Sequence, residues 1–496
     1  MSTRQPDVDA ATRRAALGDL REYLRIVTER GELEEVHGAD PTLEMGALYE
    51  LSLEKLYPPV LHFKNIKGID PDFSVLTNVR FARTLVGNLD LEAVRTLKNT
   101  TRWASDPIPP EEVNTGPIVD NVAEGDAVDL MRFPAAQWKE GDGGRYIGTE
   151  CLVINRDPDT GFVNIGTYRN MVVDRNTLAV FIEPGKHGDI IRKKYWARGE
   201  PCPMVICVGQ APVLGNVAGT TSRYGVSEYD MAGARIGRPI KTVRGRLTDL
   251  PIPADAEVAF EGFMPTVEEE SAHEGPFGEW PGYYASDIRN ETVLKVGATY
   301  HRDKPILIGQ PPARPTLPGR QPSITALASL WNALEAAGVP GVTGVWKMPG
   351  AGGSAMSFMN VVSITQMHAG HAKMAGMVAA GCAPGAYMTR VVIVVDDDID
   401  VQNPAEVMWA LATRWDPKTQ TDIIDGCWTG YIDPYLPPEK RAKDDLTTPR
   451  VIIYAVRPWH WKDDFPRVNA VSRDYADEVR RKWAAKLPFL TAPQRG

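Results

Sequence analysis

MVICV (residues 204–208) is one of several short apolar runs that decide the fold expected of this chain. Turn residues separate these runs, and the others are CLVI at 151–154, VAF at 258–260, 293–300 and ILI at 306–308. Short runs at this spacing, with few helical patterns between them, are typical of strands in a compact β-barrel or a sandwich. The sequence therefore predicts a mainly β central domain over residues 115–318.

The segment before this domain has an α/β texture. Leu17, Leu20, Leu24 and Val27 recur at steps of three and four up to Gly31, which predicts an amphipathic helix ended by glycine. Strand-like runs follow at 60–63 and 74–76, and helical spacing returns at 91–97. We expect an N-terminal α/β domain over residues 1–114, with the proline-rich stretch 105–112 as a linker.

The segment after the central domain alternates helix and strand again. Apolar spacing over 324–334 predicts a helix ended near Gly338, and 391–395 has the pattern of a buried strand. We expect an α/β domain over 319–465, preceded by a proline-studded junction at 310–322. An amphipathic helix is predicted within 466–496, capped by Ser472, whose apolar stripe packs on the same chain or on a second copy.

Composition excludes several classes of protein. The 496 residues carry 55 Lys and Arg against 64 Asp and Glu, so the net charge is 55 − 64 = −9, which disfavours nucleic acid as a partner. The five cysteines form no C-x-x-C pair, so neither a zinc knuckle nor a disulfide framework is expected. Without an apolar signal core or a membrane-spanning run, the predicted location is the cytoplasm, with no membrane partner.

HEGPFGE (residues 273–279) places Glu274 and Glu279 five residues apart around a Gly-Pro and a glycine. Proline and glycine prevent a regular helix here, so the segment is expected to be a shaped loop that aims two acids. Such a pair can divide proton transfer if its surroundings hold one acid ionised and the other near working pH. A solvated acidic turn is the alternative from this segment alone.

Three further motifs add polar groups in the same central region. NIGTYR (164–169) supplies an amide and a guanidinium, PGKH (184–187) an imidazole, and GVSE (225–228) a carboxylate. The mixed set of Asn164, His187 and Glu228 suits a divalent ion such as manganese. Taken alone, an arginine on a strand such as Arg169 is more often a solvated or ion-paired residue.

Other candidate motifs have simpler interpretations. The glycine-rich segment 349–354 fails both the P-loop and the dinucleotide spacing and is expected to be a loop. Asp396 to Asp398 could bind magnesium, but a polar turn after a strand is favoured. His368 and His371 make a poor metal site because no acid lies nearby. Neither H-E-x-x-H nor G-x-S-x-G occurs, so zinc protease and serine hydrolase are disfavoured.

Together, these motifs resemble the UbiD family of decarboxylases, which use prenylated FMN. The resemblance runs collinearly through 164–169, His187, 225–228 and 274–279, then through the VIVVDDD run at 392–398, 408–414 and 433–434. It implies an α+β multidomain protein with an N-terminal α/β domain, a central split β-barrel like that of flavin reductases, a C-terminal α/β domain and a terminal helix used in dimer contacts.

The same resemblance implies where the cofactors bind. Asn164, His187 and Glu228 would hold a manganese ion that grips the flavin phosphate, and a potassium ion would bind nearby to backbone oxygens. The cofactor-binding residues implied by the match are Asn164, Ile165, Gly166, Lys186, His187, Gly219, Thr220, Glu228 and Arg390. Arg390 stands where the family has a lysine. The position therefore keeps a positive charge, but a guanidinium replaces the ammonium group and its contact geometry differs.

The resemblance also assigns catalytic roles. Arg169 would bind the substrate carboxylate, Glu274 would hold that guanidinium through a charge-assisted pair, and Glu279 would deliver the proton. The bound cofactor would act as the electron sink for decarboxylation. Trp280 would add a flat wall that favours an aromatic acid, including fused rings. Ile165 and Gly166 look more like the hydroxybenzoate branch, whereas Glu279 resembles the ferulate branch.

The predicted function is thus reversible, non-oxidative decarboxylation of an aromatic, heteroaromatic or α,β-unsaturated acid, for example one of indole or phenazine type. The expected partners are the acid and CO2, a flavin prenyltransferase that supplies the cofactor, and a second copy of the chain in a homodimer. A conventional FMN-dependent oxidoreductase is the first alternative, although no nicotinamide fingerprint occurs. A non-catalytic assembly protein, suggested by the apolar terminal helix, is the second.

Overall fold

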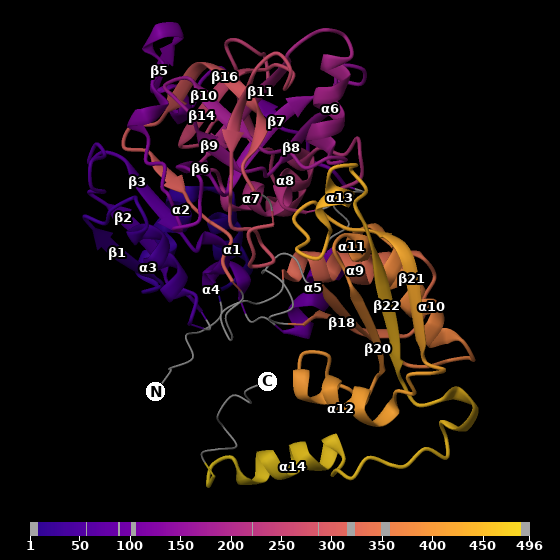
Figure 1. The fold of residues 1–496 in the computed structure, drawn as a ribbon. Coiled ribbons are helices and arrows are strands. Elements are labelled where there is room, and N and C mark those ends of the chain that lie inside the picture. The colour runs from indigo at the N-terminus through magenta and orange to yellow at the C-terminus, as the bar shows by residue number, and fades with distance from the viewer. Residues whose placement is uncertain are drawn as a thin grey trace.

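The chain folds into three packed groups of helices and strands and a separate terminal helix (Figure 1). The computed structural model describes residues 8–55, 57–87, 90–100, 106–220, 222–285, 287–314, 323–348 and 358–487. The predicted glycine-rich loop at 349–354 and most of the predicted junction at 310–322 lie outside these ranges. Within them, no helix is long and apolar enough to cross a membrane.

The N-terminal group is a four-stranded sheet in the order β1-β2-β3-β17. Its elements are β1 (Leu33–His37), β2 (Val60–Lys64), β3 (Ser74–Thr77), β17 (Ile306–Ile308), α1 (Ala10–Gly18), α2 (Leu20–Glu29), α3 (Glu44–Ser52) and α4 (Arg83–Val86). Leu20 and Val27, which the sequence places on one helical face, are buried in one cluster with Val60 and Leu76. Although it is expected in the central domain, β17 pairs in parallel with β3 and completes this sheet.

The central group is built on a larger sheet whose main path runs β6-β9-β10-β16-β14-β11-β7-β8, with β5 and β15 also paired to β16. Its strands are β5 (Asn121–Glu124), β6 (Tyr146–Gly148), β7 (Cys151–Arg156), β8 (Val163–Gly166), β9 (Asn170–Val172), β10 (Thr177–Val180), β11 (Cys202–Val208), β14 (Val258–Met264), β15 (Ser271–Glu274) and β16 (Arg289–His301). No pairing between the end strands β6 and β8 occurs in the described ranges, so closure of the predicted split barrel is not confirmed.

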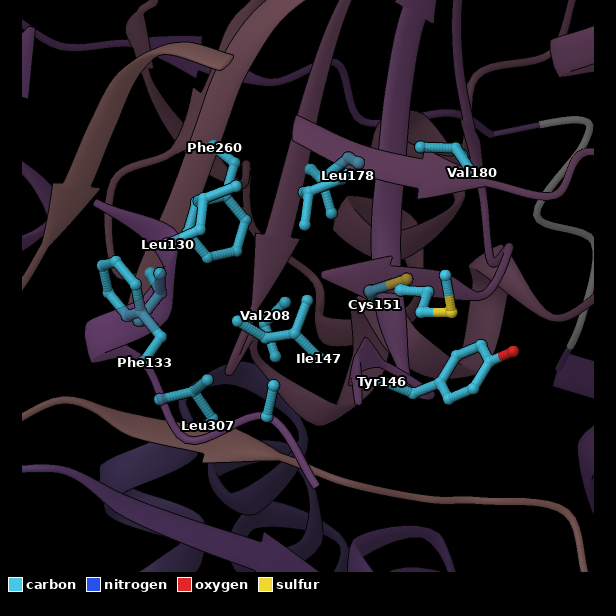
Figure 2. Close-up of a cluster of buried hydrophobic side chains, with 14 of the residues drawn as sticks. Leu130, Phe133, Tyr146, Ile147, Cys151, Leu178, Val180, Val208, Phe260 and Leu307 are labelled. Atoms are coloured by element: carbon cyan, nitrogen blue, oxygen red, sulfur yellow. The ribbon is translucent and has the colours of Figure 1, made fainter. Parts of the chain in front are cut away.

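Apolar side chains fill the interior of this central group. Leu178, Val208 and Phe260 belong to one buried cluster, and Leu307 of β17 joins it (Figure 2). Helices α6 (His187–Trp196), α7 (Pro212–Ala218) and α8 (Glu228–Ile236) pack in the same group, together with a small sheet of β13 (Pro251–Pro253), β12 (Lys241–Arg244) and β4 (Glu111–Glu112). The N-terminal and central sheets therefore share hydrophobic contacts.

The C-terminal group is a five-stranded sheet in the order β18-β19-β20-β22-β21. Its elements are β18 (Val342–Lys347), β19 (Met359–Ile364), β20 (Val391–Asp396), β21 (Thr421–Trp428), β22 (Thr447–Ala455), α9 (Ile324–Ala336), α10 (His371–Gly381), α11 (Ala383–Ala386), α12 (Pro404–Arg414) and α13 (Pro438–Arg441). The helix and the buried strand predicted at 324–334 and 391–395 are both confirmed. Helix α5 (Leu91–Thr100), expected in the N-terminal domain, places Val94 in this C-terminal core.

Two weak metal candidates are explained by other contacts. Arg414 donates to Asp396 at 2.9 Å and to Asp398 at 2.7 Å, so the acidic turn after β20 is an ion-paired turn. His371 Nδ1 accepts from the backbone N–H of Met367 at 3.2 Å. Among the described residues no group of three or more His, Cys, Asp or Glu side chains is placed to hold a metal.

The terminal helix α14 (Arg473–Trp483) lies apart from the rest of the molecule, below α12 in Figure 1. Ser472 caps it as predicted, accepting from the backbone N–H of Tyr475 at 3.3 Å. Tyr475 is 56% exposed and Trp483 is 40% exposed. This single chain therefore leaves the apolar side chains of α14 largely uncovered.

Candidate active site

The HEGPFGE segment folds as the shaped loop that the sequence predicts. Strand β15 ends at Glu274, and its pairing with β16 fixes where the loop begins. Gly143 donates its N–H to the carbonyl of Pro276 at 2.8 Å, and a Cβ at Gly143 would overlap the carbonyl of Gly275. The loop is therefore held backbone to backbone, and Gly143 has no room for a side chain.

Arg169, between β8 and β9, joins the two acids of this loop. Its Nε and Nη2 donate to the two carboxylate oxygens of Glu274 at 2.7 and 2.9 Å, and its Nη1 donates to Glu279. Tyr146 donates its hydroxyl to Glu274 at 2.8 Å. All of these side chains are buried, so water does not screen the charges. Arg169 is thus an ion-paired residue and also the centre of the predicted acid pair.

The surroundings shift the pKa values of the two glutamates in opposite directions. Burial alone would raise the pKa of Glu274, but Arg169 and the Tyr146 hydroxyl lower it below its ordinary value. Burial raises the pKa of Glu279 to about 7; Arg169 opposes this rise, and the charges of Glu274 and Glu183 reinforce it. One acid is held ionised while the other exchanges a proton near neutrality, as acid–base catalysis requires.

The aromatic ring of Phe181 packs against the guanidinium of Arg169. The Cζ of Arg169 lies 4.1 Å from the ring centroid of Phe181, and the Cζ of Arg289 lies 4.0 Å from the same ring. Two guanidinium groups on one ring are favourable because the aromatic π-system attracts cations. Phe181 therefore restricts the orientation in which Arg169 meets Glu274.

The predicted metal-binding residues lie at the starts of two helices and on a strand. His187 begins α6, Glu228 begins α8 and Asn164 lies on β8. Glu228 is buried and accepts from the N–H of Ile165 at 2.8 Å and from Ser222 Oγ at 2.7 Å. Asn164 donates Nδ2 to another side chain, which leaves Oδ1 as its open ligand atom.

The protonation of these residues suits a cation. Burial and the nearby Lys186 lower the pKa of His187, which favours the neutral imidazole that can bind metal. Burial raises the pKa of Glu228 to about 7, and a bound cation would stabilise its ionised form. An amide oxygen, an imidazole nitrogen and a carboxylate form a donor set that fits manganese.

A single cavity of about 1100 Å³ connects these groups. All but two of the predicted site residues line it. Those that do are Asn164, Ile165, Gly166, Arg169, Lys186, His187, Gly219, Thr220, Glu228, Glu279 and Trp280. Glu274 lies behind Arg169 and does not line the cavity. Arg390 also does not line it, because Asp433 binds its Nη2 at 2.8 and 2.7 Å. The structure thus does not bring Arg390 to the predicted cofactor site.

Several lining residues carry no sequence motif. Glu183 accepts from the Tyr387 hydroxyl and from the backbone N–H of Tyr431, both at 2.5 Å. Lys186 Nζ lies 3.7 Å from the ring centroid of Tyr387, and Trp428 also lines this wall. Glu183 could have been found by its place beside the PGKH motif. Tyr387 and Trp428 could not, because they reach the cavity from a distant part of the chain.

A buried guanidinium between two carboxylates whose pKa values are shifted in opposite directions, at the wall of a large cavity, is an arrangement suited to binding an organic acid and transferring a proton. The sequence matches two family models: the 3-octaprenyl-4-hydroxybenzoate carboxy-lyase Rift-related domain over residues 111–315 and the corresponding C-terminal domain over 323–455. These ranges cover more than half of the chain. The chain belongs to the UbiD family of carboxy-lyases.

Curated relatives agree with this membership. The chain is 31% identical to the pyrrole-2-carboxylic acid decarboxylase of Pseudomonas aeruginosa, over 95% of this chain and 97% of the relative. It is also 31% identical to the phenolic acid decarboxylase of Bacillus subtilis, over 88% and 93% of the two chains. No relative among these is named as an oxidoreductase, so the conventional flavin oxidoreductase gains no support from them.

Solved structures agree as well. The UbiD-class enzyme HmfF from Pelotomaculum thermopropionicum, in an evolved dimeric form in complex with prFMN, superposes with a TM-score of 0.75 at 28% identity, over 95% of this chain and all of that one. The closed form of Sedimentibacter hydroxybenzoicus vanillic acid decarboxylase gives a TM-score of 0.79 at 27% identity, over 95% and 99%. The multidomain α+β fold is therefore shared along nearly the whole chain.

Proposed function

We propose that this protein is a prenylated-FMN-dependent decarboxylase of an aromatic, heteroaromatic or α,β-unsaturated acid, acting reversibly and without oxidation. The observation that carries the proposal is the buried Arg169 that joins Glu274 and Glu279, two acids whose surroundings shift their pKa values in opposite directions. The pyrrole-acid and phenolic-acid decarboxylases among its relatives, and a structural neighbour in complex with prFMN, support the substrate class and the cofactor.

The roles of the acids follow from their contacts. Arg169 has five N–H donors, and three contacts with the glutamates use three of them, so two remain for the substrate carboxylate. Glu274 keeps the guanidinium in place. Prenylated FMN, when bound, supplies the electron sink for the pair left by departing CO2. Glu279 then gives its proton to the carbon that loses CO2, and takes one back in the reverse direction.

The remaining polar residues of the cavity would hold the cofactor. Asn164, His187 and Glu228 would bind Mn²⁺, through which the acidic protein attracts an anionic flavin phosphate, with K⁺ bound to nearby backbone oxygens. Lys186, Ile165, Gly166, Gly219 and Thr220 line the same cavity and would contact the flavin.

The wall of the cavity supports an aromatic substrate. Trp280 packs with Phe181 and Ile432, and Tyr387 lies in the same cluster. Flat side chains on several sides favour a planar ring through area burial and stacking. Single-ring and fused-ring acids both fit this chemistry.

The test of the function is reconstitution. Protein produced together with a flavin prenyltransferase should show the absorption spectrum and cofactor mass of prenylated FMN. A screen of benzoic, pyrrole-, indole- and phenazine-carboxylic acids and of cinnamic acids should then find CO2 release from at least one. A protein that carries unmodified FMN and oxidises a hydride donor instead would overturn the proposal.

The pH dependence of turnover should report Glu279. A proton donor must be protonated, so kcat is expected to be high below about 7 and to fall as the pH rises through the pKa of Glu279. Glu274 stays ionised across that range because its pKa is lowered. The measurement is kcat for CO2 release at a saturating concentration of the carboxylic acid substrate. The pH is varied from roughly 5.5 to roughly 9, on both sides of that pKa. A profile that rises through pH 7 would argue against Glu279 as the donor.

His187→Ala is expected to release both metal and flavin, because it removes the one imidazole from the donor set. Metal analysis and the flavin absorbance of the purified variant measure this loss. His368→Ala, at an exposed position outside the cavity, is the matched control and should retain both. Full retention of metal and chromophore by the His187 variant would remove it from the metal site.

The assembly and the fold class are part of the proposal. The uncovered apolar side chains of α14 would pack in a homodimer, and the dimeric form of HmfF is consistent with such an arrangement. The central sheet would form the split β-barrel of flavin reductases, with domain boundaries near residues 114, 318 and 465. A flavin prenyltransferase would supply the cofactor.

A further inference from the structure

We propose that Asn155 is a positioning residue of the metal site. It orients the side-chain amide of Asn164 so that the amide oxygen stays open to the cavity, and it ties that amide to the helix that begins at His187. The inference rests on the proposed function, because it assigns a role at the same proposed Mn²⁺ site. Asn155 is not among the described residues that line the cavity, so it acts through its neighbours and does not contact the metal.

Asn155 and Asn164 are direct partners across two strands. Strands β7 and β8 are antiparallel, and their register pairs Asn155 with Asn164. Directly opposed residues of such a pair lie on the same face of the sheet, close enough for their side chains to meet. Asn155 is fully buried and Asn164 is only 2% exposed, so water does not compete for the contact. The strand register therefore decides which side chain meets the amide of Asn164.

The hydrogen bond between the two amides has a direction. Asn164 donates Nδ2 to Oδ1 of Asn155 at 3.1 Å, while Asn164 itself lines the cavity. The nitrogen of an amide only donates, and its oxygen only accepts, so the two ends cannot be exchanged. A carbonyl oxygen suits a cation such as Mn²⁺, whereas an amide nitrogen does not. The direction of this bond thus determines whether Asn164 can serve as a metal ligand.

The other end of the Asn155 amide contacts helix α6. Asn155 donates Nδ2 to the carbonyl of Gly188 at 3.2 Å, and Gly188 directly follows His187 in the first turn of the helix. The N–H of the same glycine donates to the Tyr168 hydroxyl at 3.3 Å, so side chains bind both its N–H and its carbonyl. Helix α6 packs beside β7 and β8 (Figure 1). The start of the helix is therefore held to the strand that carries Asn164.

The carbonyl of Gly188 sets the orientation of both amides. Because a carbonyl can only accept, Asn155 must present its nitrogen to Gly188 and its oxygen to Asn164. Asn164 must then present its nitrogen to Asn155, which leaves its own oxygen for the cavity. The third proposed ligand, Glu228, is held independently by the N–H of Ile165 and by Ser222. One buried side chain thus links two of the three proposed metal-binding residues.

Metal titration of the flavin-free, full-length protein tests the proposal. Mn²⁺ is titrated into wild type and N155L, and the free ion is measured by electron paramagnetic resonance. Leucine keeps the branched shape of asparagine but neither donates nor accepts, so it no longer selects one orientation of the Asn164 amide. We expect N155L to bind Mn²⁺ roughly 10- to 100-fold more weakly, the usual scale for losing a residue that orients a metal ligand. Affinities equal within about twofold would overturn the positioning role and leave the metal site in place.

A second substitution separates orientation from packing. In N164D either carboxylate oxygen can face the metal, so no amide has to be oriented. Adding N155L to N164D should therefore weaken Mn²⁺ binding by less than about threefold, in contrast to its effect in the wild type. A loss of the same size in both backgrounds would show that leucine disturbs the site by packing alone, and it would overturn the proposal.

N360L is the matched control for damage to the fold. Asn360 is also a fully buried asparagine on a strand, it donates Nδ2 to the Thr389 hydroxyl at 2.9 Å, and it is not among the residues that line the cavity. Both leucine variants should unfold at a lower temperature than the wild type, because each leaves a buried polar partner unsatisfied. N360L should keep its Mn²⁺ affinity within about twofold. An equal loss of affinity in N360L would trace the effect to instability and overturn the positioning role.

These measurements do not depend on turnover. A protein that showed the expected Mn²⁺ affinities but released CO2 from no acid would overturn the proposed function and leave the role of Asn155 standing. A wild type that bound no Mn²⁺ would overturn the metal site and this role together.

Discussion

Glu279→Gln is expected to lower turnover by roughly 10² or more, the usual scale for loss of a general acid. Glutamine keeps the size of the side chain and can still accept a hydrogen bond from Arg169, but it has no proton to give near pH 7. Flavin should stay bound, because Glu279 is not among the proposed ligands of the metal or the phosphate. The measurement is CO2 release at saturating acid, with flavin content determined on the same sample.

Glu291→Gln provides the matched control for that substitution. Glu291 is also a buried glutamate whose pKa burial raises, it lies 3.1 Å from Arg289, and it does not line the cavity. Its variant should keep turnover within a few-fold of the wild type, because Glu291 does not line the cavity and so does not contact a bound acid. Near-normal CO2 release by Glu279→Gln would remove Glu279 from the role of proton donor.

Arg169→Met is expected to abolish measurable decarboxylation and to destabilise the fold. The substitution removes the guanidinium that is proposed to bind the substrate carboxylate, and it leaves Glu274, whose pKa Arg169 lowers, buried without its cation. Breaking a buried ion pair by removing one partner costs about 3–5 kcal/mol. We therefore expect a lower melting temperature and loss of saturable acid binding. Thermal unfolding and ligand titration on the same preparation measure the two effects separately.

Arg289→Met tests whether these effects belong to Arg169 alone. Arg289 also lies against the ring of Phe181 and does not line the cavity, so its loss should weaken packing and leave acid binding in place. Equal losses of acid affinity in the two variants would show that Phe181 packing, rather than a direct contact with Arg169, controls binding.

The structure brings together Arg169, Glu274 and Glu279, which the sequence singles out because they lie in short local motifs. Glu274 and Glu279 occur on one loop whose glycines and proline restrict its path, and Arg169 follows a recognisable strand. Their meeting in space, however, depends on the pairing of β15 with β16, which no local pattern shows. Tyr146 is absent from the prediction for this reason, since a lone tyrosine at the start of a short strand carries no signal of its distant partner.

The errors in the prediction have the same origin. Arg390 was expected at the cofactor from its place in the family match, whereas the structure pairs it with Asp433, 43 residues later in the chain. The run at 306–308 has the texture of the strands before it, yet its backbone pairs with β3, more than 200 residues earlier in the chain. Helix α5 likewise packs on the C-terminal core through Val94. Local apolar patterns indicate what kind of element forms, whereas long-range pairing decides which layer it joins.

The division of the cavity wall has a consequence for how this enzyme can change over time. The loop that carries Glu274 and Glu279 is held backbone to backbone at Gly143, a position that accepts no side chain, so variation there is strongly constrained. Tyr387, Trp428 and Lys347 belong to the C-terminal part of the chain and face the cavity from separate segments. Natural or directed evolution can therefore change which acid is accepted through substitutions in that wall, while the loop with Glu274 and Glu279 stays the same.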